Sequence, residues 1–175
     1  MFSIVAVLLL LIVFAILFMA SMKPDMFRVE RSAVINAPPE KIFPYINELR
    51  RWDAWSPYEK KDPNMKRSFS GPPSGKGAAY AWEGNKNVGS GRMEITDAVP
   101  SSKIGIKLDF LKPIEGHNTA EFTLQPEGGA TRVTWAMFGP ANLLSKVMDT
   151  VIGMDKMIGT DFAAGLASLK RVAEG

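Results

Sequence analysis

The sequence contains no cysteine, only one histidine (His117) and no charged residue before Lys23. Without cysteine there is no disulfide framework, and a zinc site of the usual His/Cys kind cannot be assembled. A Ser-His-Asp site would have to use His117, which we interpret as a surface turn residue, and no serine lies in the pattern Gly-x-Ser-x-Gly. We therefore recognise no catalytic motif and expect neither a metal ion nor a cofactor.

The uncharged N-terminal segment is a long apolar run. Fourteen of the residues from Phe2 to Phe18 are Leu, Ile, Val or Phe. As a helix, residues 1–22 would extend about 33 Å, enough for a hydrocarbon core of about 30 Å. Their insertion gains about 4–8 kcal/mol with no charge to oppose it. The segment predicts a transmembrane anchor, so the membrane is an expected partner.

Two other interpretations of this segment are weaker. A cleaved signal peptide needs a basic start, a shorter apolar run and a small-x-small cleavage site, but the only small pair near the end of the run is Ala20-Ser21. A buried core helix without a polar face would need a larger protein around it. Lys23, Arg28 and Arg31 follow the apolar run, and by a small margin they favour a cytoplasmic location for the rest of the chain.

After the anchor we expect a linker at residues 23–26 and one domain at residues 27–175, which is large enough for its own core. The net charge of +3 is spread over this domain. Nucleic-acid binding would need a denser basic patch interleaved with aromatic residues, so it is not expected. Nucleotide binding is not expected either, because Gly75-Lys76-Gly77 and Gly89-Ser90-Gly91 lack a third glycine and a following helix.

Hydrophobic periodicity predicts an α+β domain. Alternation indicates a strand at residues 27–35, and helical spacing follows Pro38-Pro39, with Pro44 expected to kink or shorten that helix. A second short helix is expected to end at Pro57. Period-two patterns then predict an antiparallel meander with strands beginning at Lys66 and spanning residues 78–83, 88–98, 103–110, 117–125 and 131–138.

The last segment predicts one long helix. Apolar residues recur every three or four positions from Leu144 to Val172. Gly153, Gly159 and Gly165 interrupt the pattern and indicate a bend or the close approach of another surface. The helix must bury its apolar stripe against the sheet, and a curved sheet around one helix leaves a cavity.

The chain resembles the SRPBCC superfamily, which has the START and Bet v 1-like helix-grip fold, and within it the polyketide cyclase/dehydrase and lipid transport branch. The resemblance spans about residues 27–173. It rests on Val29-Glu30-Arg31-Ser32, Ile35-Asn36-Ala37-Pro38-Pro39-Glu40-Lys41-Ile42-Phe43, Trp52-Asp53-Ala54-Trp55-Ser56-Pro57, the strand from Gly77 to Trp82, Met154-Asp155-Lys156-Met157-Ile158-Gly159-Thr160-Asp161-Phe162 and Gly165-Leu166-Ala167-Ser168-Leu169-Lys170. It implies a cavity for a hydrophobic ligand between the sheet and the long helix, and it identifies no catalytic residue.

Large apolar side chains are the candidates for the cavity wall, although the same residues could form an ordinary filled core. They are Tyr80, Trp82, Met93, Phe110, Phe122, Trp135, Met137, Met148 and Met154. Trp52 and Trp55 would lie at the pocket mouth or clamp the second helix. Asp149, Asp155 and Asp161 are six residues apart, so successive carboxylates point about 240° apart on a helix and cannot share one face. Of the three, Asp155 is the candidate to face the cavity.

We therefore expect membrane-anchored binding, extending to transport, of a lipid or another hydrophobic small molecule in an internal cavity. One alternative is a cyclase or hydrolase-type enzyme that uses the same cavity, which requires ionisable groups inside it. Another is an interaction domain at the membrane, which requires a filled core and an exposed apolar patch.

Overall fold

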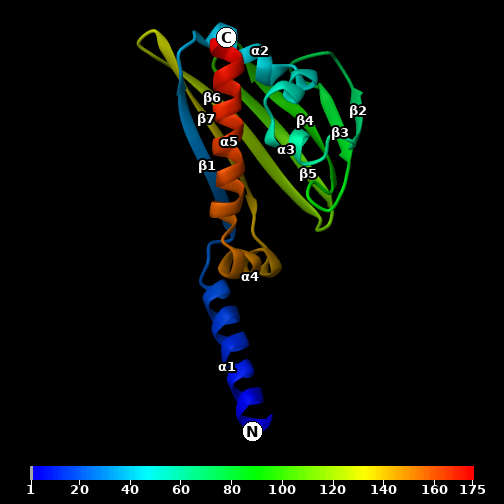
Figure 1. Cartoon of the computed structure of the whole chain (residues 1–175), viewed down its shortest axis with the longest axis vertical. Coiled ribbons are helices and arrows are strands. Elements are labelled where there is room, and N and C mark those ends of the chain that lie inside the picture. The colour runs from blue at the N-terminus through cyan, green and yellow to red at the C-terminus, as the bar shows by residue number, and fades with distance from the viewer. Residues whose placement is uncertain (1) are drawn as a thin grey trace.

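The computed structural model describes residues 2–175, so Met1 of the predicted anchor lies outside the described residues. Helix α1 (Phe2–Ser21) projects from a domain in which a curved sheet packs on a long C-terminal helix (Figure 1). From Ile4 to Ser21 the helix is long and apolar enough to cross a membrane. Its side chains are exposed along most of this length, but Ala20 near its end is fully buried.

The domain contains a seven-stranded antiparallel sheet with the order β1-β7-β6-β5-β4-β3-β2. The strands are β1 (Met26–Ile35), β2 (Lys66–Ser70), β3 (Ala79–Glu83), β4 (Ser90–Val99), β5 (Lys103–Lys112), β6 (Gly116–Glu127) and β7 (Ala130–Pro140). Consecutive strands from β2 to β7 are neighbours, and β1 pairs with β7 and forms an edge of the sheet. The predicted meander is confirmed, because each strand from β2 to β7 pairs antiparallel with the next one along the chain.

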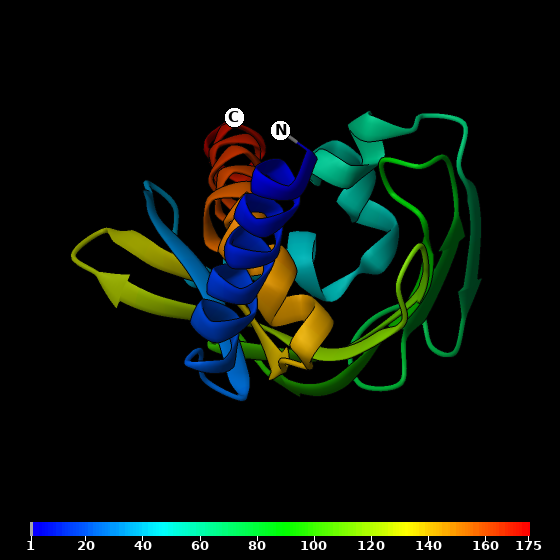
Figure 2. The same cartoon turned by 90° about the horizontal axis from the view of Figure 1, so that it is seen from below.

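Three short helices lie between β1 and β2: α2 (Pro39–Asn47), the 3₁₀ helix η1 (Leu49–Ala54) and α3 (Pro57–Lys61). Pro44 lies inside α2, which ends three residues later. The prediction that a helix ends at Pro57 is wrong, since Pro57 is the first residue of α3. Proline suits the first helical position because its fixed φ fits the helix and its missing N–H would have no helical partner there. Seen from below, these helices and the C-terminal helix lie on the concave side of the sheet (Figure 2).

The predicted long helix is two helices, α4 (Leu143–Ile152) and α5 (Met154–Glu174). Gly153 separates them with a φ of 78°, a left-handed conformation that favours glycine, and this produces the predicted bend. The two other glycines lie where α5 closely approaches the sheet. A Cβ at Gly165 would contact Trp135, and one at Gly159 would overlap the Arg31 guanidinium.

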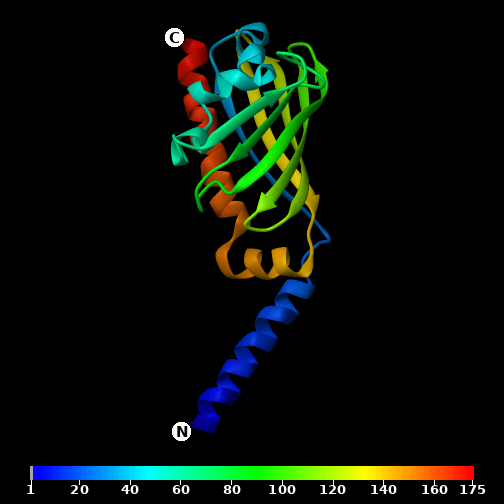
Figure 3. The same ribbon diagram turned by 90° about the vertical axis from the view of Figure 1, so that its right-hand side faces the viewer.

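Only α5 buries its apolar stripe against the sheet, through Phe162, Leu166, Leu169 and Ala173. Helix α4 lies between α1 and the domain, across the long direction of the molecule (Figure 3). The expectation that one stripe is buried along the whole segment therefore holds for α5 and fails for α4, whose apolar residues Leu143, Leu144, Val151 and Ile152 are exposed.

Candidate functional site

The centre of the concave face is filled by an aromatic cluster, which we define as Trp52, Trp55, Phe122, Trp135 and Phe162. The Trp135 ring stacks on Phe162 at 4.0 Å and on Phe122 at 5.0 Å between ring centroids. Trp52 and Trp55 each contact the Phe122 and Trp135 rings edge-on, at 5.5–6.3 Å between ring centroids. All five side chains are buried. The space beneath the middle of α5, where the sequence predicts a cavity, therefore holds side chains.

Trp52 and Trp55 hold η1 against its neighbours rather than lining an opening. The indole N–H of Trp52 donates to the Ile46 carbonyl at 3.0 Å, and that of Trp55 donates to the Tyr45 carbonyl at 2.8 Å. Both acceptors belong to α2. Of the two alternatives for these tryptophans, the geometry corresponds to the hydrophobic clamp.

The indole N–H of Trp135 is the exception in this cluster. Among the described residues, no acceptor lies within hydrogen-bond distance of Trp135 Nε1, although this atom is buried. Burying a donor without a partner costs about 1–3 kcal/mol. A water molecule or a ligand oxygen that reached this N–H would remove that cost.

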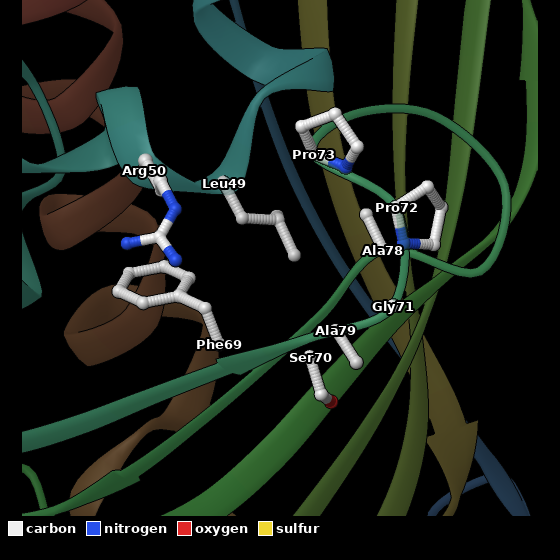
Figure 4. Close-up of a pocket in the computed structure, with 9 residues that line it drawn as sticks. All are labelled: Leu49, Arg50, Phe69, Ser70, Gly71, Pro72, Pro73, Ala78 and Ala79. Atoms are coloured by element: carbon white, nitrogen blue, oxygen red, sulfur yellow. The ribbon is translucent and has the colours of Figure 1, made fainter.

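A pocket of about 200 Å³ opens at the upper edge of the concave face, between η1 and strands β2 and β3 (Figure 4). Polar and apolar atoms line it about equally, and its one charged side chain is Arg50, whose guanidinium lies 4.3 Å above the Phe69 ring. The lining residues are Leu49, Arg50, Phe69, Ser70, Gly71, Pro72, Pro73, Ala78 and Ala79. Apolar side chains beside an exposed guanidinium suit the anionic or polar end of a molecule that also has an apolar part.

Phe69 of the pocket is also the first ring of an aromatic row, which we define as Phe69, Tyr80, Trp82 and Phe110. Successive ring centroids along this row are 4.9, 6.1 and 5.9 Å apart. The row follows the inner face from the pocket to the end of β5 that is nearer α4. Trp82 and Phe110 are only partly buried, unlike the aromatic cluster. Three cavity candidates, Tyr80, Trp82 and Phe110, thus lie in one row of rings, in which Tyr80 is buried and Trp82 and Phe110 are partly exposed.

A polar group, Glu59 on α3, lies beside the aromatic row. The Tyr80 hydroxyl donates to Glu59 Oε1 at 2.7 Å, and Arg67 Nε donates to Glu59 Oε2 at 2.6 Å. Burial, followed by this hydrogen bond, raises the pKa of Tyr80. Sequence reasoning missed Glu59, because α3 meets β2 and β3 only in the folded chain.

A second ionisable pair lies between α3 and α5. Lys61 Nζ donates to Asp161 Oδ2 at 2.6 Å. Burial, followed by the charge of Asp161, raises the pKa of Tyr58. Glu59 and Asp161 each have a cationic partner, which neutralises the charge of the carboxylate. Within residues 2–175, no three acidic or histidine side chains gather where they could hold a metal ion.

The remaining candidates divide between two regions. Met93 and Met137 are buried on the inner face of the sheet. Met148 is half-buried on α4, and Met154 lines a pocket of about 110 Å³ between the linker and α4. Asp155 is exposed and its carboxylate binds the Arg31 guanidinium at 3.0 Å, which lowers the pKa of Asp155. The structure thus places Asp155 on the surface, away from the aromatic row.

Comparisons with known proteins agree with this architecture. The model of the family described as polyketide cyclase/dehydrase and lipid transport matches residues 26–174. The chain is similar to protein CV1439 from Chromobacterium violaceum, with a TM-score of 0.60 and 15% identity over 87% of this chain and 99% of that chain. It is also similar to protein SA2116 from Staphylococcus aureus, a protein of unknown function, with a TM-score of 0.64 and 11% identity over 85% of this chain and 94% of that one. At these identities the likeness concerns the fold alone, and no curated protein matches the chain.

Proposed function

Because the chain belongs to the polyketide cyclase/dehydrase and lipid transport family, we propose that it is a membrane-anchored binding protein for a lipid or another hydrophobic small molecule. The family suggests either hydrophobic ligand binding or a cyclase-like role. Binding is the better supported of the two here, because Glu59 and Asp161, the acidic groups identified near the concave face, are both engaged by cations.

The observation that carries the proposal is the aromatic row with a pocket at one end. A volume of about 200 Å³ is below the 300–1,000 Å³ typical of sites for drug-sized ligands. The pocket therefore takes one end of a molecule, and the rest lies along the partly exposed rings of Trp82 and Phe110. Covering these rings removes apolar area from water, which contributes about 25 cal/mol per Å². Arg50 at the pocket rim orients a polar or anionic end group.

In this proposal α1 is the anchor, with the domain on the cytoplasmic side as Lys23, Arg28 and Arg31 favour. Only residues 22–25 separate α1 from β1. A linker of this length keeps the domain close to the bilayer, so a lipid could pass between the membrane and the aromatic row without crossing bulk water.

Native mass spectrometry of the full chain, extracted in mild detergent, tests this function. We expect an apolar molecule to remain bound after the detergent is removed. Phe69→Ala should reduce the bound fraction several-fold, because it removes both the pocket wall and the contacts of that ring with Tyr80 and Arg50. Ser68→Ala is the matched control, since Ser68 lies on the other face of β2, and it should retain the ligand. A bare polypeptide for the unmodified chain, or equal loss in both variants, would contradict the proposal.

A further inference from the structure

Helix α4 is amphipathic, with its two faces sharply separated. At 100° per residue, its apolar residues occupy one half of the helix, an arc of about 180°. They are Leu143, Leu144, Val147, Met148, Val151 and Ile152. The other half carries the polar residues Ser145, Lys146, Asp149 and Thr150.

The orientation of α4 is the reverse of that expected for a helix on a water-soluble domain. The exposed fractions of Leu143, Leu144, Val151 and Ile152 are 57%, 53%, 63% and 55%, whereas Lys146 is only 9% exposed. The polar half faces the protein, and four of the six apolar residues face outward, while Val147 and Met148 are half-buried. A surface helix in water normally turns its apolar stripe inward.

Two ion pairs fix this orientation. Lys146 Nζ donates to Asp25 Oδ1, and Lys23 Nζ donates to Asp149 Oδ2, each at 2.5 Å. Lys23 and Asp25 belong to the linker that follows α1, so the polar half of α4 is bound to the segment immediately after the apolar helix. Asn142 caps α4 by accepting a hydrogen bond from the Ser145 N–H at 2.8 Å.

We propose that α4 lies in the membrane interface, with its apolar half in the boundary between the headgroups and the acyl chains. This inference rests on the proposed role of α1 as the anchor. If α1 crosses the bilayer, Ser21 is near the surface, and α4 is in contact with α1 at that level. Helix α4 also runs across the molecule rather than along it (Figure 3). A short amphipathic helix of this kind binds in the plane of the interface.

A second exposed apolar element lies on the same side of the domain. Leu111 and Ile114, at the turn between β5 and β6, are exposed. This turn points toward the end of the molecule that carries α4 (Figure 3). Phe110, the last ring of the aromatic row, immediately precedes Leu111. With α4 seated on the bilayer, the row would end close to the lipid surface.

The absence of cysteine from the sequence makes spin labelling at single sites direct. The full chain would carry one nitroxide at Leu144→Cys or Val151→Cys, and be reconstituted in vesicles of phosphatidylcholine and phosphatidylglycerol. A label at Leu10→Cys serves as the reference for a site in the anchor. A label at Gly129→Cys, at the exposed turn between β6 and β7, serves as the reference for a site in water. Collision with oxygen, which partitions into lipid, is compared with collision with a water-soluble nickel chelate.

We expect the nitroxides at positions 144 and 151, like the one at position 10, to collide several-fold more with oxygen than with the nickel chelate. The nitroxide at position 129 should collide more with the nickel chelate than with oxygen. If the nitroxides at positions 144 and 151 collide more with the nickel chelate than with oxygen while position 10 remains in lipid, the inference is overturned and the anchor is left intact. Low accessibility to both reagents at 144 and 151 would mean that a second copy of the chain covers α4, which also overturns it. More frequent collision with the nickel chelate than with oxygen at position 10 would refute the anchor itself.

Discussion

Trp135 on β7 and Phe162 on α5 stack with their ring planes 10° apart, and this contact joins the long helix to the middle of the sheet. Both side chains are buried. We expect Phe162→Ala to lower the free energy of unfolding by about 3–5 kcal/mol, since it removes a buried aromatic side chain and leaves a cavity. Chemical unfolding of the detergent-solubilised chain, followed by tryptophan fluorescence, measures this loss.

Phe138→Ala is the control, because Phe138 lies on β7 three residues after Trp135 and is half-buried on the outer face. Its loss should be clearly smaller than that of Phe162→Ala. Equal losses in the two variants would mean that the stack does not hold α5 to the sheet.

The glycines of α5 should respond differently to the same added methyl group. In Gly165→Ala the new Cβ would lie 2.7 Å from the Trp135 ring and 3.0 Å from Pro57 Cδ, both held in the packed interior, so the variant should be destabilised. In Gly159→Ala the obstacle is the flexible end of Arg31, which can move away. Alanine also favours a helix by about 1 kcal/mol over glycine. Thermal unfolding should therefore show a lower midpoint for Gly165→Ala and little change for Gly159→Ala.

The sheet and the glycine bend could be predicted because both depend on local sequence. Alternation along each strand identifies the inner face without knowledge of its partner, and glycine is the residue that best tolerates the φ of 78° found at Gly153. The sequence alone does not decide between a cavity and a filled core at the centre. The filled core depends on η1 folding back so that Trp52 and Trp55 meet Phe122 and Trp135, and no periodicity encodes a contact between residues so far apart in the sequence.

The same limit applies to α4 and to the candidate site. The apolar spacing of α4 continues that of α5, so the pattern predicts one face but not what covers it. The pocket and Glu59 were missed because β2, β3, η1 and α3 meet only through tertiary packing. Among the candidates, Tyr80 and Trp82 were identified by alternation on a single strand, which is local information.

Acid should release the ion pairs between α4 and the linker. The Lys23 ammonium lowers the pKa of Asp149, and the Lys146 ammonium lowers that of Asp25. Because these carboxylates titrate lower in the folded chain, their contribution to stability is present above the ordinary aspartate pKa of about 3.9 and is lost as the pH falls through the lowered value. A nitroxide at Thr150→Cys should be immobile at pH 6 and become mobile only below the ordinary aspartate pKa, as the pH falls through the lowered value.

Asp149→Asn provides the matching test at constant pH. It removes the charge that binds Lys23 and should increase amide hydrogen exchange in residues 143–152 several-fold. Asp53→Asn, on η1 away from α4, should leave that exchange unchanged. Unaltered exchange in Asp149→Asn would show that the ion pair does not hold α4 in place.

His117 should titrate above an ordinary histidine, with the opposite sign of pH dependence. His117 Nδ1 lies 2.7 Å from Asp109 Oδ1 across the β5–β6 hairpin, and this contact raises the pKa of His117 above 6.5. The contribution of the charged pair to stability is therefore full below about pH 6.5 and is lost as the pH rises through the raised value. Since the chain has a single histidine, one imidazole NMR signal reports the titration. Asp109→Asn should return the pKa toward 6.5, and Glu94→Gln, a change on neighbouring β4, should leave it raised. An ordinary pKa in the unmodified chain would mean that His117 and Asp109 do not pair in solution.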